Sequence, residues 1–132
     1  MLLRMRIYDT MTNQIRDLEP KDPHKISIYA CGPTVQDVPH LGHARTALTY
    51  DVLKRYLVWA GFEVFLVSNI TDIDDKIINR ALAEGISEEE LAQTYANIHI
   101  EQLRNFGIKD PDERPRATQF IQQMISIIEE LM

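Results

Sequence analysis

Several features are scarce in this 132-residue sequence, and each scarcity excludes a class of protein. The single cysteine cannot form an internal disulfide, which excludes the small secreted proteins that disulfides hold together. No apolar run approaches the roughly 18–20 residues that a membrane span needs, and the N-terminal residues lack the apolar core of a signal peptide. The sequence therefore predicts a cytoplasmic protein without a membrane partner.

Positive charge is also scarce, because 14 Lys and Arg face 20 Asp and Glu, for a net charge of −6. Such a chain has no general electrostatic attraction to nucleic acid, so any such contact needs a local patch or parts outside these residues. The hydrophobic content of 45% is ordinary for a globular protein. Neither a repeat nor a linker interrupts the sequence, which predicts one globular unit.

The first half of the chain alternates between strand and helix patterns. Residues 26–31 form a short apolar run that ends at Gly32, which is typical of a buried strand. Residues 42–60 carry apolar side chains at helical spacing before Gly61, and residues 63–68 form a second apolar run. A strand, helix and strand of these lengths predict a βαβ unit in a parallel sheet.

The other elements are one short strand and three helices. An edge strand and turn are predicted at residues 5–8, and helices at 72–84, at 87 to about 106 and at 118–132. The last helix has a broad apolar face that continues to the final residue without a capping signal. We therefore expect the sequence to be part of a longer protein.

The first candidate site is Cys31-Gly32-Pro33-Thr34, directly after the first strand of the βαβ unit. Ligands of open α/β sheets bind beyond the carboxyl ends of the strands. Cys31 is interpreted either as a small buried side chain or as a thiolate metal ligand. Zinc needs three or four ligands and the sequence has no Cys-x-x-Cys pair, so both interpretations stay open.

The second candidate site is His40-Leu41-Gly42-His43, at the start of the long helix. A helix N-terminus attracts anions, and two imidazoles three residues apart can add hydrogen bonds to phosphate oxygens. Gly42 leaves room for a base or backbone to approach. The alternative is a turn in which two exposed histidines cap the helix.

The third candidate site follows the second strand, at residues 69–76. Thr71 or Asp72 either caps the next helix or, for Thr71, contacts a ligand beside Cys31. A magnesium site is disfavoured because carboxylates at positions 72, 74 and 75 point in different directions around a helix. Outside these sites, the expected roles are structural: surface or packing positions for His24 and His99, and a hydrogen-bonding anchor for Asp51.

Taken together, the segments ACGPTVQDVPHLGHARTALTYDVLKRYL, VSNITDIDDKIINRA and ERPRAT closely resemble the catalytic N-terminus of cysteinyl-tRNA synthetases, which are class I enzymes. HLGH stands at the place of the family's HIGH signature. The resemblance runs from about Met5 to the end of the chain. It implies half of a Rossmann-like nucleotide-binding fold followed by helices of an inserted segment, with residues 1–132 as the N-terminal portion of the catalytic domain.

The resemblance also implies a reaction and its partners. ATP, with magnesium, would activate L-cysteine to cysteinyl-adenylate, and the cysteinyl group would pass to tRNA(Cys). His40 and His43 would act as the catalytic residues that bind the ATP phosphates, with Gly42 near the adenine.

The resemblance also implies that three residues bind and select the cysteine substrate. Gly32 and Thr71 would hold the cysteine, and Cys31 would be one ligand of a zinc ion whose other ligands lie outside this chain. Zinc binds a thiolate readily and a neutral hydroxyl poorly, which would select cysteine over serine.

The family's KMSKS-type lysine loop, its second half of the nucleotide-binding fold and its anticodon-binding domain have no counterpart in the sequence. We therefore expect the 132-residue chain alone to be inactive and to bind zinc weakly. Three alternatives remain: a cysteine ligase of mycothiol biosynthesis, a non-catalytic truncated nucleotide-binding module, and a small metal hydrolase that uses Cys31, His40 and His43.

Overall fold

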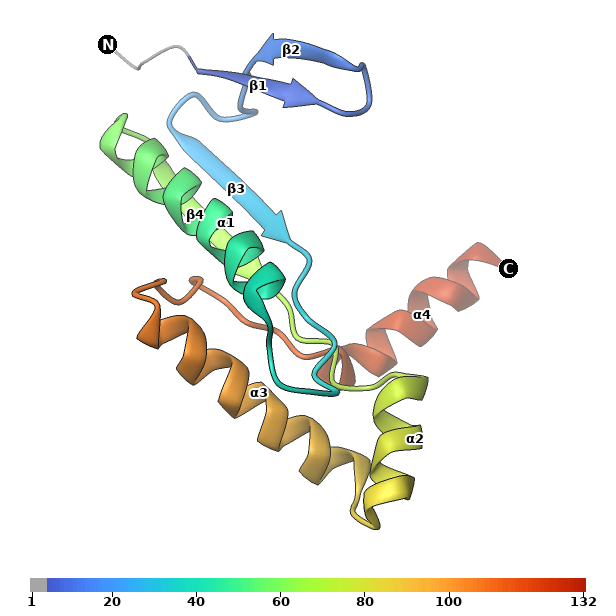
Figure 1. Cartoon of the computed structure of the whole chain (residues 1–132). Helices are drawn as coiled ribbons and strands as arrows, with labels where there is room; N and C mark the ends of the chain where they lie inside the picture. Colours follow the sequence, from blue (N-terminus) through green and yellow to red (C-terminus); the bar gives the residue numbers. More distant parts are fainter. Residues whose placement is uncertain (1–4) are drawn as a thin grey trace.

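The computed structural model describes residues 5–132, which begin with a small hairpin (Figure 1). Strands β1 (Arg6–Asp9) and β2 (Gln14–Asp17) pair antiparallel. Asn13 lies in the turn with a φ of 54°, a conformation that asparagine tolerates better than most residues. The predicted edge strand is confirmed one residue later than expected, whereas β2 was missed because it lies in the polar stretch that was interpreted as a turn.

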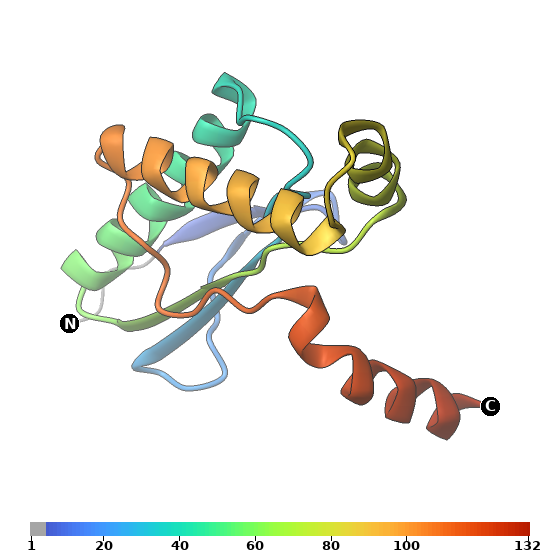
Figure 2. The ribbon, with the colours of Figure 1, turned by 90° about the horizontal axis from the view of Figure 1, so that it is seen from below.

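The predicted βαβ unit is confirmed. It consists of β3 (Lys25–Ala30), α1 (Leu41–Trp59) and β4 (Glu63–Ser68). β3 and β4 pair in parallel, from Lys25 opposite Glu63 to Ala30 opposite Ser68. α1 lies along one face of this sheet, and the later helix α3 (Glu88–Asn105) lies on the same side (Figure 2). The chain is thus a mixed α/β structure with a parallel sheet at its centre.

A polar segment at 112–117 runs beside β4, where the sequence suggested only a loop. Ser68 N donates to Glu113 O at 3.0 Å, and Ile70 N donates to Pro115 O at 2.8 Å. The carboxylate of Asp112 fixes the start of this segment, because Oδ2 accepts from Leu66 N and from Lys54 Nζ, each at 2.6 Å. The segment therefore extends the sheet by backbone pairing although it carries no strand pattern.

Helices α2 (Asp75–Glu84) and α3 pack against each other over a small core. Gly85 ends α2 with a left-handed φ of 71°, and the Ser87 side chain accepts a hydrogen bond from Glu90 N at 3.1 Å as the cap of α3. These boundaries were predicted. The core consists of buried Val35, Ile70, Ile77, Ala81, Leu91, Ala92 and Ala96.

The predicted start of α2 at residue 72 is wrong. The cap is Asp74, whose side chain accepts from Lys76 N at 2.9 Å, so neither Thr71 nor Asp72 caps the helix. Thr71 instead forms a parallel bridge with Thr34. Buried Asp72 accepts hydrogen bonds from Thr118 N at 3.0 Å and Thr118 Oγ1 at 2.6 Å. These long-range contacts keep the two residues outside the helix.

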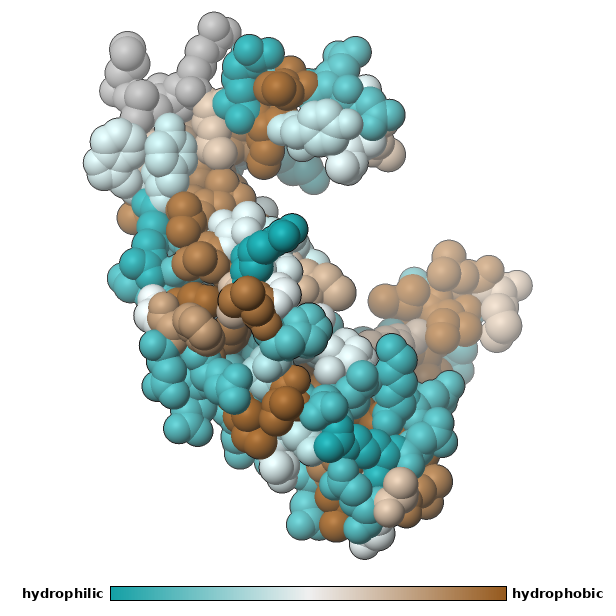
Figure 3. Space-filling view, viewed as in Figure 1, coloured by the Kyte–Doolittle hydropathy of each residue, from teal (hydrophilic) through white to brown (hydrophobic). Residues whose placement is uncertain are grey.

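The C-terminal segment forms a short 3₁₀ turn, η1 (Ala117–Phe120), and then α4 (Ile121–Leu131). The predicted helix is therefore confirmed, with a tighter first turn. α4 extends away from the rest of the chain (Figure 1), and all its residues are exposed. Its apolar side chains gather into the patch visible in Figure 3: Ile121, Met124, Ile125, Ile127, Ile128 and Leu131. Within residues 5–132, no helix combines the length and apolar character needed to cross a membrane.

Candidate functional site

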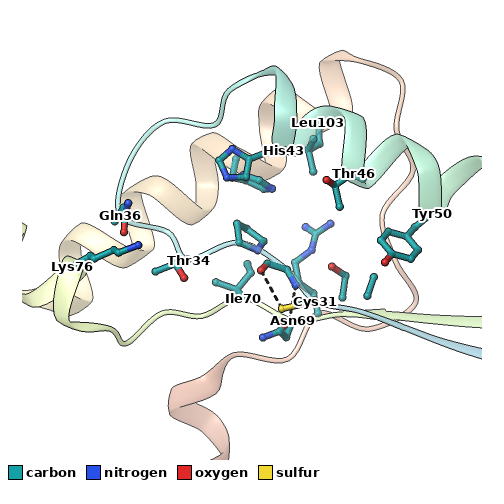
Figure 4. Close-up of a pocket in the computed structure, with 17 residues that line it drawn as sticks. Cys31, Thr34, Gln36, His43, Thr46, Tyr50, Asn69, Ile70, Lys76 and Leu103 are labelled. Atoms are coloured by element: carbon teal, nitrogen blue, oxygen red, sulfur yellow. Dashed lines mark hydrogen bonds between the residues drawn. The ribbon is translucent and has the colours of Figure 1, made fainter. Parts of the chain in front are cut away.

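A pocket of about 400 Å³ lies at the carboxyl ends of β3 and β4 (Figure 4). Cys31 and Gly32 line it directly after β3, and Ser68 and Asn69 line it at the end of β4. His43 at the start of α1 forms the opposite wall. The position agrees with the rule that open α/β sheets bind ligands beyond the carboxyl ends of their strands.

The two strand ends are held together by a close backbone contact at Gly32. Gly32 N donates to Asn69 Oδ1 at 2.7 Å, and a Cβ atom on Gly32 would lie only 1.5 Å from the Asn69 carbonyl oxygen. A side chain at this position would force the strand ends apart. The absence of a side chain at Gly32 thus shapes the floor of the pocket.

Thr71 continues the contact between the strand ends. Its N donates to Pro33 O at 3.0 Å and its O accepts from Val35 N at 3.2 Å. Thr71 is half-buried and does not belong to the residues that line the pocket. Its contact with substrate remains a prediction.

Cys31 carries an exposed thiol, so its interpretation as a small buried side chain is wrong. Its Sγ has one weak contact, to Gly32 O at 3.8 Å. In the described part of the chain, no three His, Cys, Asp or Glu side chains come close enough to hold a metal ion. These residues therefore do not fit a complete zinc site, and Cys31, His40 and His43 do not form the centre of a metal hydrolase.

His40 and His43 are held by backbone hydrogen bonds at the start of α1. Nδ1 of His40 accepts from Gly42 N at 3.1 Å, and Nδ1 of His43 accepts from His40 N at 3.1 Å. The two rings lie 4.0 Å apart between centroids. Because each Nδ1 is an acceptor, each neutral ring carries its proton on Nε2 and is a donor there. Capping and phosphate binding are therefore compatible roles for the same two rings.

Gly42 provides the space for this arrangement. A Cβ atom on Gly42 would lie 2.8 Å from Cε1 and 2.9 Å from Nδ1 of His40. In this structure the open space is thus taken by the imidazole of His40. The predicted contact of Gly42 with adenine remains a prediction.

His99 was expected to be a surface or packing residue outside the candidate sites; the packing role is confirmed, but the residue also belongs to the pocket. It is 8% exposed, lines the pocket from α3, and meets the His43 ring edge-on with 5.7 Å between centroids. Burial, followed by His43 and Arg114, lowers the pKa of His99 to about 4. Burial and then His40 also lower the pKa of His43. His99 is therefore uncharged at neutral pH.

The pocket contains two cations to which the sequence analysis assigned no role. Arg114 enters it from the segment beside β4, and Arg114 Nη2 pairs with Asp110 Oδ1 at 2.9 Å. Lys76 enters it from the first turn of α2. Within residues 5–132, no carboxylate forms an ion pair with Lys76.

Asp51 and His24 lie away from the pocket, as predicted. Asp51 is buried, and its carboxylate accepts two hydrogen bonds from Arg55, at 3.1 and 2.6 Å. Arg55 also donates to Gly107 O at 2.9 Å and so ties α1 to the end of α3. Asp51 is thus the structural anchor that was expected, and His24 is an exposed residue.

Comparison with known proteins gives a consistent result. Residues 17–132 match the family model described as "tRNA synthetases class I (C) catalytic domain". The chain is 45% identical over 128 residues to the cysteine–tRNA ligase of Thermodesulfovibrio yellowstonii, and the aligned region covers 97% of this chain and 26% of that protein. Against the cysteine–tRNA ligase of Helicobacter acinonychis the identity is 47%, over 97% of this chain and 28% of the relative.

An archaeal relative is equally similar. The cysteine–tRNA ligase of Thermococcus gammatolerans is 44% identical over 129 residues, which is 98% of this chain and 27% of that protein. The chain thus spans little more than a quarter of the length of these relatives.

Proposed function

Because the chain belongs to the family of class I tRNA synthetase (C) catalytic domains, we propose that it forms the N-terminal portion of the catalytic domain of a cysteine–tRNA ligase. The intact protein would activate L-cysteine with ATP and transfer the cysteinyl group to tRNA(Cys). The observation that carries the proposal is the 42–47% identity to cysteine–tRNA ligases over nearly the whole chain.

In the proposed activation step, a carboxylate oxygen of cysteine attacks the α-phosphorus of ATP. A new P–O bond gives cysteinyl-adenylate, and the bond to the departing pyrophosphate breaks. Negative charge grows on the phosphate oxygens during this step. Such a reaction depends mainly on orientation and on electrostatic stabilisation, so it needs no strong general base in the pocket.

His40 and His43 are proposed to provide that stabilisation. Their hydrogen bonds fix both rings with Nε2 as the donor, and the N-terminus of α1 adds its own positive potential. The lowered pKa of His43 keeps this ring neutral at physiological pH, so it donates a hydrogen bond without carrying a charge. ATP, with magnesium, would thus lie across the start of α1, with Gly42 near its adenine.

The cysteine substrate is proposed to bind at the strand ends, near Gly32 and Thr71. Cys31 presents an exposed thiol in the same pocket and would supply one ligand to a zinc ion. The described residues do not complete such a site, so its other ligands would come from outside these 132 residues.

The test is cysteine-dependent exchange of pyrophosphate into ATP by the whole protein that contains this chain, with serine as the control substrate. We expect exchange with cysteine alone, and a loss of about 100-fold or more in rate for His43→Ala, as for other donors to a developing charge. The isolated 132-residue chain should be silent.

The molecule that accepts the cysteinyl group distinguishes a cysteine–tRNA ligase from other cysteine ligases. Charging of tRNA(Cys) supports the proposal, whereas transfer of cysteine to an amino sugar would indicate a cysteine ligase of mycothiol biosynthesis. A whole protein that shows no pyrophosphate exchange with cysteine or with serine would instead be a non-catalytic nucleotide-binding module.

A further inference from the structure

His99 differs in kind from the other buried residues of α3. The others are aliphatic: Leu91, Ala92, Ala96 and Leu103. Within residues 5–132, the ring of His99 forms no hydrogen bond with another residue, so hydrogen bonding in the fold does not account for a ring at this position. The contact that a ring makes here, and that an aliphatic side chain would not reproduce, is with His43.

The ring of His43 is restrained from two elements. At the start of α1, its Nδ1 accepts from His40 N at 3.1 Å and its ring lies 4.0 Å from the His40 ring between centroids. From α3, His99 meets it with 5.7 Å between centroids and 76° between the ring planes. An edge-on pair brings the positive edge of one ring to the negative face of the other. These contacts together restrict rotation of the His43 ring about its Cβ–Cγ bond.

That rotation decides what His43 presents to the pocket. While Nδ1 accepts from the His40 backbone, the proton lies on Nε2, which is then the donor available to a ligand. A half-turn of the ring would break this hydrogen bond and put Cε1 in the place of Nε2. The donor of His43 therefore depends on whatever prevents the turn.

α3 is fixed well enough to hold His99 in place. Leu103, one helical turn after His99, packs in a buried cluster with Ala44 and Ile108, and it lies on the same side of the pocket as His43 (Figure 4). Ala96, on the preceding turn, belongs to the core between α2 and α3. His99 thus lies between two buried clusters, and a well-packed helix presents its ring to α1.

We infer that His99 is a positioning residue for His43. Its edge-on contact keeps Nδ1 of His43 on the His40 backbone and leaves Nε2 as the donor in the pocket, while His99 itself needs no contact with a substrate. The inference rests on the proposed function, in which His43 donates to the phosphate oxygens. Since the contact requires an aromatic ring, phenylalanine should replace His99 and leucine should not.

The first measurement observes His43 directly. The imidazole nitrogen signals in NMR distinguish the two neutral tautomers and the charged ring, and they are recorded at about pH 8, where an ordinary histidine is neutral. Wild type and His99→Phe should give the same signals, with the proton on Nε2. His99→Leu should increase the share of the other tautomer about two- to tenfold, which corresponds to the loss of one aromatic pair.

The second measurement is cysteine-dependent pyrophosphate exchange in the whole protein. His99→Leu should lower the maximal rate about two- to tenfold and leave the KM for cysteine within about twofold, because only the donor to the developing charge is misoriented. His99→Phe should keep the wild-type rate. The matched control His24→Leu replaces an exposed histidine outside the pocket and should change neither parameter nor the signals of His43.

A residue that merely fills space predicts a different pattern. It would be replaced equally well by leucine and phenylalanine, so equal exchange rates for the two variants would overturn the inference. His43 signals in His99→Leu that match the wild type would overturn it as well. Circular dichroism checks that each variant folds, and His99→Met takes the place of His99→Leu if leucine is not tolerated.

The two proposals fail in different ways. A wild-type whole protein without exchange would reject the proposed function, whereas the tautomer of His43 in the His99 variants still decides the inference. Normal exchange in wild type together with equal rates in His99→Leu and His99→Phe would reject the inference and leave the proposed function intact.

Discussion

Gly32 shows how a single residue determines the shape of the pocket. Because a Cβ atom would lie 1.5 Å from the Asn69 carbonyl oxygen, Gly32→Ala must separate the ends of β3 and β4. We expect a loss of about 1–3 kcal/mol in the free energy of unfolding, the usual range for overpacking. Urea denaturation followed by circular dichroism measures this loss.

Gly42→Ala is the matched control for that substitution. Its Cβ would meet only the imidazole of His40, a side chain that can turn aside, whereas Gly32 meets backbone. We expect a change within about 1 kcal/mol, since alanine also favours the helix. Equal stability of the two variants would show that the strand ends tolerate a side chain.

His99 makes stability depend on pH. Its pKa falls from about 6.5 in the unfolded chain to about 4 in the folded chain, because burial disfavours the charged ring. The unfolded chain therefore binds more protons between these values, and the contribution of His99 to stability decreases as the pH falls from 6.5 to 4.

The size of this effect is on the order of 2–3 kcal/mol. It is measured as the difference in unfolding free energy between the wild type and His99→Leu at pH 7 and pH 4.5. The variant should lose less stability on acidification. A parallel loss in both proteins would mean that His99 titrates normally in the folded state.

At the scale of elements, α4 differs from every other helix. It has 11 residues, all exposed, and its main contacts are with the adjoining η1. An isolated helix of this length is marginal in water. We expect its amide protons to exchange at least about 100-fold faster than those of buried positions in α3, as measured by hydrogen exchange and NMR.

The internal control for α4 is the N-terminal half of α3, which contains buried Leu91, Ala92 and Ala96. Slow exchange there, together with fast exchange in α4, follows from the difference in burial. Equal protection of the two helices in dilute solution would mean that the apolar side of α4 is covered.

Helices and strands were predictable wherever short-range signals act. The glycine after α2, the serine before α3 and the apolar run of β4 placed those boundaries within one residue. The start of α2 was not predictable, because the hydrogen bonds of Asp72 come from Thr118, which is 46 residues away. The polar segment beside β4 was missed for the same reason.

At the scale of the whole molecule, the exposed apolar side chains of α4 predict self-association. We expect the chain to sediment as a concentration-dependent mixture rather than as a monomer. The double variant Ile125→Glu and Ile128→Glu should shift it towards monomer, because both side chains lie in the apolar patch.

Gln122→Glu with Gln123→Glu is the matched control, since it adds the same charge to α4 and leaves the apolar side chains unchanged. This control should still associate. A wild-type chain that sediments as a monomer at high concentration would contradict the prediction, as would equal dissociation of the two double variants.

The sequence by itself determined the local structure and the identity of the family. The periodicity of apolar residues, the helix caps and the turn residues act over a few positions. The βαβ unit, the helices that follow it and the order of the motifs could therefore be predicted from the sequence. Cys31, Gly32 and His43 all line the pocket, because each lies at the end of an element whose boundary was predictable, and their roles stay predictions.

Only the tertiary structure decided which distant side chains share the pocket. His99 reaches His43 because α3 packs across the start of α1, and Arg114 arrives through backbone pairing beside β4. Such contacts depend on the relative positions of whole elements, and the local patterns that define each element carry no information about them.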